Sequence, residues 1–486
     1  MGQGDHRNHR ETEVGKRPRI VTDRTTTGGE FHHTSEAPVE DGEFVVRGQL
    51  LVDRLVLEHV VGELPEGTRP LPASDIGGDR LSELLQWAAA GGQGDGGGQY
   101  GAAGTSGPRG SDAGSYGQAG GAGGGQGGGD GGQGGDGGQG GDDEAVPFVR
   151  FELPPGEDLL CVVRRLRQRF GSAVGPNHVF FGEQSYAGSP ASPPAPAPPG
   201  WTSRPGRGPS VGRVGIIDTG FADFSATTES DRLDGIDRAP FSIDEPDADP
   251  VDGKLDWEAG HGTFIAGQVR HAQPDAEIVV IKGLDGFGTI SEADLCHLML
   301  IAARRGIDVL NLSLGGYALD DECPSGLSAT LAQLVYRRDL VIVAAAGNKG
   351  SDRPFWPAAS KHVVAVGALN EARGWPAWFT NFGPWVDACA PGVDRTSWFF
   401  DFDGGLDAVP MSAVVEDFEF WATWSGTSFA APQFCAAVCA LRAKLELEGT
   451  PIGFRDAALR LVARGIRTVS GLGTEFDVDT AALAWP

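Results

Sequence analysis

Four side chains in this sequence have the types that acyl transfer to a hydroxyl group requires: Asp218, His261, Asn348 and Ser428. A serine hydroxyl is a weak nucleophile at neutral pH, and a neutral imidazole must take its proton. A carboxylate fixes the tautomer of that imidazole, and an amide donates to the oxyanion of the tetrahedral intermediate. The four residues stand in the segments Ile216-Ile217-Asp218-Thr219-Gly220, Gly260-His261-Gly262-Thr263-Phe264, Ala344-Ala345-Ala346-Gly347-Asn348 and Gly426-Thr427-Ser428-Phe429.

The residues around Ser428 indicate a tight turn that leads directly into a helix. Gly426 permits a sharp bend, because it has no Cβ. Thr427 and Ser428 favour helix N-termini, and Pro432 falls near the first turn, where its missing N–H costs little. The hydroxyl then lies near backbone N–H groups without partners in the helix, which suits a nucleophile whose attack creates an oxyanion. An ordinary helix start has the same pattern, so the case for chemistry depends on the three residues upstream.

The elements that position these residues alternate along the second half of the chain. Buried-type strands alternating with helices predict an α/β domain of three layers, with a mainly parallel sheet between helices. Function in such sheets lies at the carboxyl ends of strands, where Asp218 and Asn348 are expected. We expect strands at 214–218, 278–281, 307–312, 340–346 and 362–366, and helices at 290–305 and 326–338.

Composition limits the class of protein. The 486 residues carry a net charge of −27, which argues against nucleic acid or an anionic membrane as the principal partner. The first residues have no apolar signal segment, and no apolar run is long enough to span a membrane. We therefore expect a cytoplasmic protein, with secretion by a non-signal route left open. The six cysteines lack zinc spacing, and Cys435 and Cys439 are expected to be small core residues.

The 76 glycines and 32 prolines are clustered, so part of the chain is not packed core. One or two strands are expected within 43–62, a helix at 79–90, and a β-α-β arrangement of 146–151, 158–170 and 178–182. The expected parts are a disordered segment at 1–42, small α/β elements at 43–90, a flexible Gly-rich linker or insertion at 91–142, a β-α-β unit at 143–186, an extended Pro-rich connector at 187–210 and the main domain at 211–486.

The four motifs, in this order, resemble those of the subtilisin-like (subtilase, S8-type) serine peptidases, and the resemblance covers about residues 211 to 470. It implies an endopeptidase, a hydrolase that acts on proteins or peptides. Asp218 would orient the base, His261 would act as general base and then acid, and Ser428 would be the nucleophile. Asn348 and the backbone N–H of Ser428 would form the oxyanion hole.

The resemblance also implies a site for the substrate backbone, which would pair as an added strand along 311–316. The walls of the primary specificity pocket have small uncharged residues, so an apolar or aromatic side chain is expected before the scissile bond. The expected substrate-binding residues are Ser313, Leu314, Gly315, Ala345, Ala346 and Gly347.

Some features depart from the family pattern. Phe264 and Phe429 replace residues common in the family, and both are expected to be packing positions. The aromatic-rich stretch 396–424 predicts a hairpin packed on the body, with a lid or docking surface as the alternative. The acidic residues of 229–258 predict a solvated loop. No cofactor is required for the chemistry; family members bind calcium, and no ligands for a structural calcium ion are assigned here.

The family resemblance gives the front half a role. In the family a small α/β prodomain assists folding and blocks the cleft, and the unit at 143–186 resembles one, with 43–90 supplying its missing elements. Cleavage within about 184–210 follows from that hypothesis. Two alternatives remain: a regulated protease whose residues 1–200 recruit a protein partner or substrate, and a subtilase-fold binding protein that is no longer catalytic.

Overall fold

The structure is a computed structural model, and it describes residues 31–33, 44–91, 146–182, 192–198, 211–224, 235–248, 253–337, 339–370, 374–406 and 415–476. Within the segment expected to be disordered, 1–42, it describes only β1 (Phe31–His33), which pairs antiparallel with β2. The Gly-rich segment lies outside the described residues, apart from its first residue, Gly91. No helix in the described ranges is long and apolar enough to cross a membrane.

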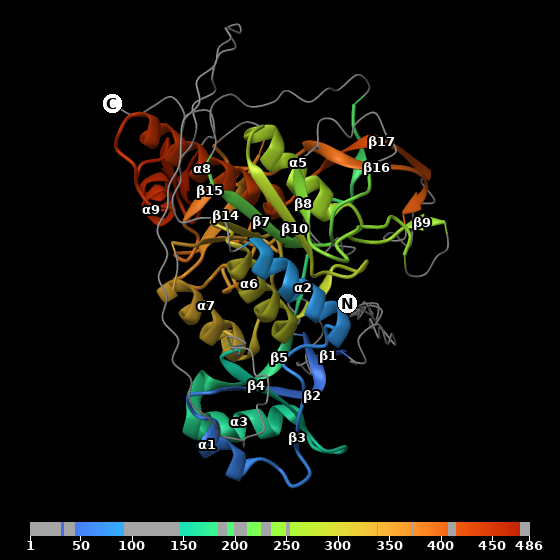
Figure 1. Ribbon diagram of the computed structural model, residues 1–486, viewed down its shortest axis with the longest axis vertical. Coiled ribbons are helices and arrows are strands. Elements are labelled where there is room, and N and C mark those ends of the chain that lie inside the picture. The colour runs from blue at the N-terminus through green and yellow to red at the C-terminus, as the bar shows by residue number, and fades with distance from the viewer. Residues whose placement is uncertain are drawn as a thin grey trace, which may run out of the picture. The chain divides into compact units, whose positions relative to one another are not determined.

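The main domain is built on a sheet of nine strands among the described residues, in the order β18-β19-β15-β14-β13-β12-β7-β10-β8 (Figure 1). All its pairs are parallel except β18 with β19, so the predicted mainly parallel sheet is confirmed. The strands are β7 (Arg213–Asp218), β8 (Ile236–Arg238), β10 (Glu277–Lys282), β12 (Val309–Leu312), β13 (Val341–Ala345), β14 (Val364–Leu369), β15 (Ala388–Pro391), β18 (Arg467–Val469) and β19 (Gly473–Glu475).

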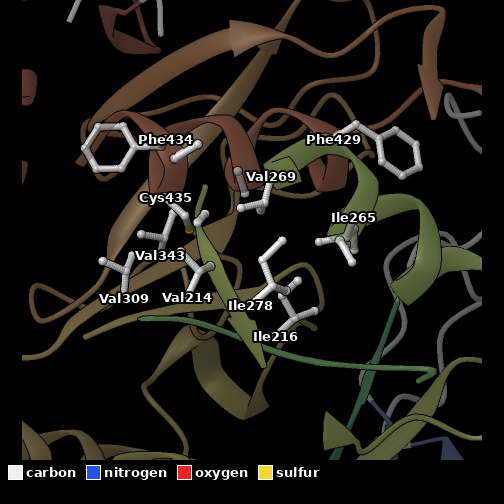
Figure 2. Packing of buried hydrophobic residues seen from close by; sticks show 14 of the residues in the cluster. Val214, Ile216, Ile265, Val269, Ile278, Val309, Val343, Phe429, Phe434 and Cys435 are labelled. Atoms are coloured by element: carbon white, nitrogen blue, oxygen red, sulfur yellow. The ribbon is translucent and has the colours of Figure 1, made fainter. Parts of the chain in front are cut away.

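Helices cover both faces of this sheet, because successive strand residues point to opposite sides. Val214 and Ile216 of β7 pack in one cluster with α5 (His261–Ala272), α8 (Ala431–Leu447) and α9 (Phe454–Ala463). Ile217 packs in the opposite cluster with α6 (Glu292–Arg305) and α7 (Ser325–Arg337). Figure 2 shows the first cluster, in which side chains of α5 and α8 meet those of the strands. These are the two outer layers that the sequence predicts.

The aromatic-rich stretch forms a long hairpin of β16 (Arg395–Leu406) and β17 (Val415–Trp424). Its edges pair with β9 (Lys254–Leu255) and with β6 (Ala195–Pro196), a short extended piece of the Pro-rich connector. The predicted packing on the body is confirmed, because these aromatic side chains are buried: Trp398, Phe399, Phe400, Phe418 and Trp424.

A second sheet has the order β11-β5-β2-β4-β3 and joins the front half of the chain to the main domain. Its strands are β2 (Phe44–Asp53), β3 (Arg69–Pro70), β4 (Phe148–Glu152), β5 (Val174–Phe181) and β11 (Thr289–Ser291), the last of which belongs to the main domain. Helix α3 (Leu159–Phe170) covers it, and Asp158 caps that helix by accepting from the N–H of Cys161. We call the described residues 44–91 and 146–182 the N-terminal unit.

Two features of the N-terminal unit differ from the sequence expectation or extend it. Of the one or two strands expected within 43–62, one forms, β2, and Leu57–Val60 form a helical turn, α1, instead of a second strand; the apolar side of this turn packs on the sheet. Helix α2 (Gly78–Gly91) forms where a helix is expected and packs against α6 of the main domain (Figure 1). Its buried residues Leu84 and Ala88 belong to the same cluster as α6.

Cysteines 161, 296, 323, 389, 435 and 439 are all free thiols. Cys435 and Cys439 are fully buried in α8, as predicted for small core residues. Burial raises the pKa of Cys435 well above its ordinary value and that of Cys439 to about 12. These two thiols therefore serve packing.

Candidate active site

The carboxylate of Asp218 lies at the carboxyl end of β7 and is fully buried. Its Oδ1 accepts from the N–H of Thr219 at 2.8 Å and lies 2.8 Å from Nδ1 of His261. His261 is the first residue of α5, so the helix start and the strand end must come close together. Gly262 makes this approach feasible, since a Cβ at that position would lie 2.3 Å from the carbonyl oxygen of Gly220.

The imidazole of His261 lies among aromatic rings. Its centroid is 5.4 Å from the ring of Trp424 and 5.5 Å from that of Phe429. Phe429 in turn packs on Phe264, with centroids 4.5 Å apart, and both are fully buried. The packing role predicted for Phe264 and Phe429 is therefore confirmed, and Phe429 and Trp424 restrict the imidazole.

Ser428 lies in a single 3-10 turn, Thr427–Phe429, immediately before α8. Pro432 occupies the first turn of α8, as expected. Gly426 has a φ of 175°, which is extended backbone, so the prediction of a sharp bend at this glycine is wrong. The direction of the chain changes instead at the 3-10 turn.

The hydroxyl of Ser428 is almost fully buried and donates to the carbonyl of Ser313 at 3.4 Å. Nε2 of His261 has no hydrogen-bond partner among the described residues. The structure thus makes the Asp218–His261 contact, but not a hydrogen bond between His261 and Ser428. Such bonds are commonly long or misaligned without substrate.

Asn348 follows β13, and its side-chain oxygen is held firmly. Oδ1 accepts from the backbone N–H of Thr427 at 2.8 Å and from its Oγ1 at 2.9 Å. Because both donors are on the oxygen, the amide nitrogen is directed to the other side of the group. Asn348 is thereby tied to the residue immediately before Ser428.

The six residues predicted to bind substrate lie at the ends of two adjacent strands. Leu312 of β12 pairs with Ala344 of β13, so the segments that follow run side by side. All six are buried: Ser313, Leu314, Gly315, Ala345, Ala346 and Gly347. Ser313 also donates from Oγ to the carbonyl of Ser428 at 2.8 Å, which joins this segment to the serine turn.

The end of β5 enters this region from the N-terminal unit. The N–H of Phe181 donates to the carbonyl of Gly315 at 2.9 Å, and the N–H of Gly315 donates back at 2.8 Å. On the other side, the N–H of Gly182 donates to the carbonyl of Gly288 at 2.8 Å. The chain therefore runs as an added antiparallel strand along a segment predicted to pair with substrate.

One buried acid behind the site has no counterpart in the sequence prediction. Oδ2 of Asp244 accepts from Oγ1 of Thr219 at 2.7 Å and from the N–H of Gly260 at 2.9 Å. It thus joins the residue after Asp218 to the residue before His261. Burial raises its pKa to about 7, partly offset by the charge of Lys282 and the hydrogen bond from Thr219.

The acidic segment 229–258 is therefore not a uniformly solvated loop. Asp244, Asp256 and Glu258 are buried, so the prediction is wrong for these three residues. No sequence signal separates Asp244 from its neighbours, because its partners Thr219 and Gly260 lie outside this loop or far along the chain. Within the described ranges, no group of three or more His, Cys, Asp or Glu side chains is arranged to hold a metal ion.

Comparison with known proteins identifies the family. The model of the subtilase family, Peptidase_S8, matches residues 210–460. The chain is 31% identical over 281 residues to the thermophilic serine proteinase of Bacillus sp. (strain AK1), an alignment that covers 56% of this chain and 60% of that protein. It is 27% identical over 309 residues to thermitase of Thermoactinomyces vulgaris, covering 62% of this chain and 94% of that protein.

Among solved structures, that of the prenylagaramide maturation protease PagA is similar, with a TM-score of 0.44 and 20% sequence identity. The alignment covers 57% of this chain and 94% of that one. The family match spans more than half of the chain, and the chain belongs to the subtilase family of serine peptidases. The predicted class, a serine endopeptidase among the hydrolases, is confirmed at the level of the family.

Proposed function

We propose that this chain is an active serine endopeptidase in which Ser428, His261 and Asp218 act as nucleophile, base and orienting acid. The observation that carries the proposal is the buried 2.8 Å contact between Asp218 and Nδ1 of His261, which leaves Nε2 for the serine proton. Oγ of Ser428 attacks the substrate carbonyl, and its proton passes to Nε2. His261 then protonates the leaving amine, and water hydrolyses the acyl-enzyme by the same route.

The oxyanion of the tetrahedral intermediate would be met by the Asn348 amide and by the backbone N–H of Ser428. The two bonds from Thr427 to Oδ1 of Asn348 support this role, because they fix the direction of the amide nitrogen. The substrate backbone would extend along Ser313 to Gly315 as an antiparallel strand. No metal ion takes part in these steps; a structural calcium ion remains a prediction without assigned ligands.

We infer that the N-terminal unit is a prodomain that the enzyme cleaves from itself. Two contacts of the chain bracket the active site. Before it, Phe181 pairs with Gly315. After it, Nε1 of Trp424 donates to the carbonyl of Ser192 at 2.7 Å, and β6 pairs with β17. These contacts place Phe181 and Ser192 on two sides of the active site, which supports cleavage between them.

The contacts on either side narrow the stretch that would be cut. Residues 183–191 lie outside the described residues, after Gly182, whose N–H donates to the carbonyl of Gly288, and before Ser192. We propose that the cleaved bond lies between Gly182 and Ser192.

Intact-mass analysis of purified full-length wild type beside Ser428→Ala tests the proposal, together with labelling by a fluorophosphonate serine probe. We expect a new N-terminus within 183–192 in wild type, labelling of wild type, and neither in Ser428→Ala. Labelling without cleavage would refute the prodomain role and support a permanently attached unit. Failure of both labelling and peptide turnover would refute the peptidase and favour a non-catalytic binding protein.

The alternative of a regulated assembly, in which residues 1–200 recruit a partner, is tested with the same preparation. It predicts a protein that co-purifies with the full chain and is lost when the N-terminal unit is removed. A partner of this kind and a cytoplasmic location remain predictions.

A further inference from the structure

One side chain that is not among the expected substrate-binding residues lies against both expected walls of the primary specificity pocket. Gly315 and Gly347 stand on the two walls predicted for this pocket. A Cβ added to Gly315 would lie 2.3 Å from Cε1 of Phe355, and one added to Gly347 would lie 3.0 Å from Cδ1 of the same ring. One aromatic ring therefore lies against both walls, in the space between them.

The surroundings of Phe355 hold this ring in place. Tyr317 packs edge-on against it, with centroids 5.3 Å apart. The next residue, Trp356, exchanges two backbone hydrogen bonds of 2.8 Å with Gly316. The Phe355 carbonyl also accepts from the N–H of Ala359 at 2.7 Å. The backbone on both sides is thus fixed, and the ring cannot leave the space without loss of packing.

Phe355 is partly exposed, whereas Trp356 and Tyr317 beside it are buried. A ring that packs against two buried glycine walls and still keeps an exposed face is expected where it forms the floor of an open depression. The small residues of the two walls favour a long or aromatic substrate side chain. The ring of Phe355 fills part of the space between these walls, so the pocket is shallower than the small residues alone indicate.

We propose that Phe355 closes the primary specificity pocket and sets its preference to side chains shorter than phenylalanine. The inference deepens the proposed peptidase function and rests on it. On sequence grounds an apolar or aromatic side chain is expected before the scissile bond. Under this proposal aromatic side chains are disfavoured, because Phe355 limits the length of the side chain that fits.

The test is a pair of fluorogenic peptides that differ only in the residue before the scissile bond, alanine or phenylalanine, hydrolysed by the full-length protein after self-processing. For wild type we expect kcat/KM for the phenylalanine peptide to be about tenfold or more below that for the alanine peptide. Phe355→Ala should raise the ratio of phenylalanine to alanine by about 100-fold, because it opens the depth that the ring fills.

Phe355→Leu provides a second variant if Phe355→Ala folds poorly. It should raise the ratio of kcat/KM for the phenylalanine peptide to that for the alanine peptide by a smaller factor. Tyr336→Ala removes an exposed aromatic side chain elsewhere on the main domain and should leave the ratio unchanged. A wild type that prefers phenylalanine, or a ratio unaffected by both Phe355 variants, would overturn the inference alone. Failure to hydrolyse either peptide, together with failure to self-process, would overturn the proposed function and this inference with it.

Discussion

Ser428 and Ser313 exchange two hydrogen bonds: Oγ of Ser428 donates to the Ser313 carbonyl at 3.4 Å, and Oγ of Ser313 donates to the Ser428 carbonyl at 2.8 Å. The start of the serine helix is thereby tied to the segment that follows β12. Because the Ser428 hydroxyl donates to this carbonyl, the hydroxyl must rotate away from it and break this bond before His261 can take its proton. Substrate pairing along the same segment competes for the Ser313 carbonyl and favours that rotation.

Ser428→Ala should lower kcat by about 10⁶-fold, as loss of the nucleophile does in subtilisin. The thermal unfolding temperature should change little, because the bond that the hydroxyl donates is long. Peptide hydrolysis and a thermal melt of the same preparation measure both effects. Ser425→Ala is the matched control, since Ser425 lies three residues away and accepts only from the N–H of Asp394 and donates to its carboxylate. Retention of more than about 1% of the activity by Ser428→Ala would exclude Ser428 as the nucleophile.

Asn348→Ala should lower kcat by about 10²–10³-fold with little change in KM, because the oxyanion forms only in the transition state. Thr427→Val removes one of the two donors to Oδ1 of Asn348 and leaves the backbone N–H, so a loss of about tenfold is expected. Steady-state kinetics that separate kcat from KM check both variants. An increase in KM at constant kcat would instead assign Asn348 to binding of the ground state.

The sequence predicts those parts of the structure that depend on local patterns. Continuous apolar runs such as 278–281 identify strands that are buried on both faces, and β10 forms there. The Asp218 and His261 motifs are recognisable because close approach of a strand end and a helix start requires glycine at 262, and the positive φ of 115° at position 220 favours glycine there. In these cases the physical cause lies in consecutive residues.

The features that the sequence does not reveal depend on partners far away in the chain. Asp244 is one of many acids in its segment, and only its bonds to Thr219 and Gly260 distinguish it. Phe355 lies against both Gly315 and Gly347 because of where β12 and β13 end, which no local pattern shows. Helix α2 could be predicted as a helix, but its apolar side gives no indication that it packs on α6.

The buried acid Asp244 gives the protein a pH dependence of stability. Burial raises its pKa from 3.8 to about 7 in the folded state. The unfolded chain loses this proton near pH 4, while the folded protein keeps it to about pH 7. Between these values the folded state binds more protons, so the contribution of Asp244 to stability falls as the pH rises through this window and is constant above it.

Asp244→Asn retains an oxygen that can accept from Thr219 and Gly260, but it does not titrate. Its unfolding temperature, relative to that of the parent, should therefore rise as the pH is increased from 4 to 7.5. Thermal melts of both proteins in the Ser428→Ala background, which prevents self-cleavage, measure this difference. Asp401→Asn is a control on an exposed carboxylate and should give melting curves parallel to the parent across the range. The same parallel result for Asp244→Asn would show that Asp244 is ionised in the folded state throughout.

Helix α2 is held on the main domain by Trp87 and Arg305. The guanidinium of Arg305 lies 4.4 Å from the centroid of the Trp87 ring, and its Nη1 donates to the Trp87 carbonyl at 2.9 Å. Nη2 also pairs with Asp237 of β8 at 2.6 Å. If the chain is cut beyond β5 as proposed, this anchor would still hold the N-terminal unit on the main domain.

Trp87→Ala should loosen this anchor by about tenfold, the effect of losing a partly desolvated cation–π contact and its packing. In full-length Ser428→Ala protein, amide hydrogen exchange of residues 78–91 should accelerate by that factor, while exchange in α3 stays unchanged. In the self-processed protein, the same substitution should raise peptidase activity, because the N-terminal unit dissociates more readily from Gly315. Glu83→Ala, on the exposed side of α2, is the control and should change neither quantity. Faster exchange without a gain in activity would mean that pairing of β5 with Gly315 is enough to hold the N-terminal unit in place.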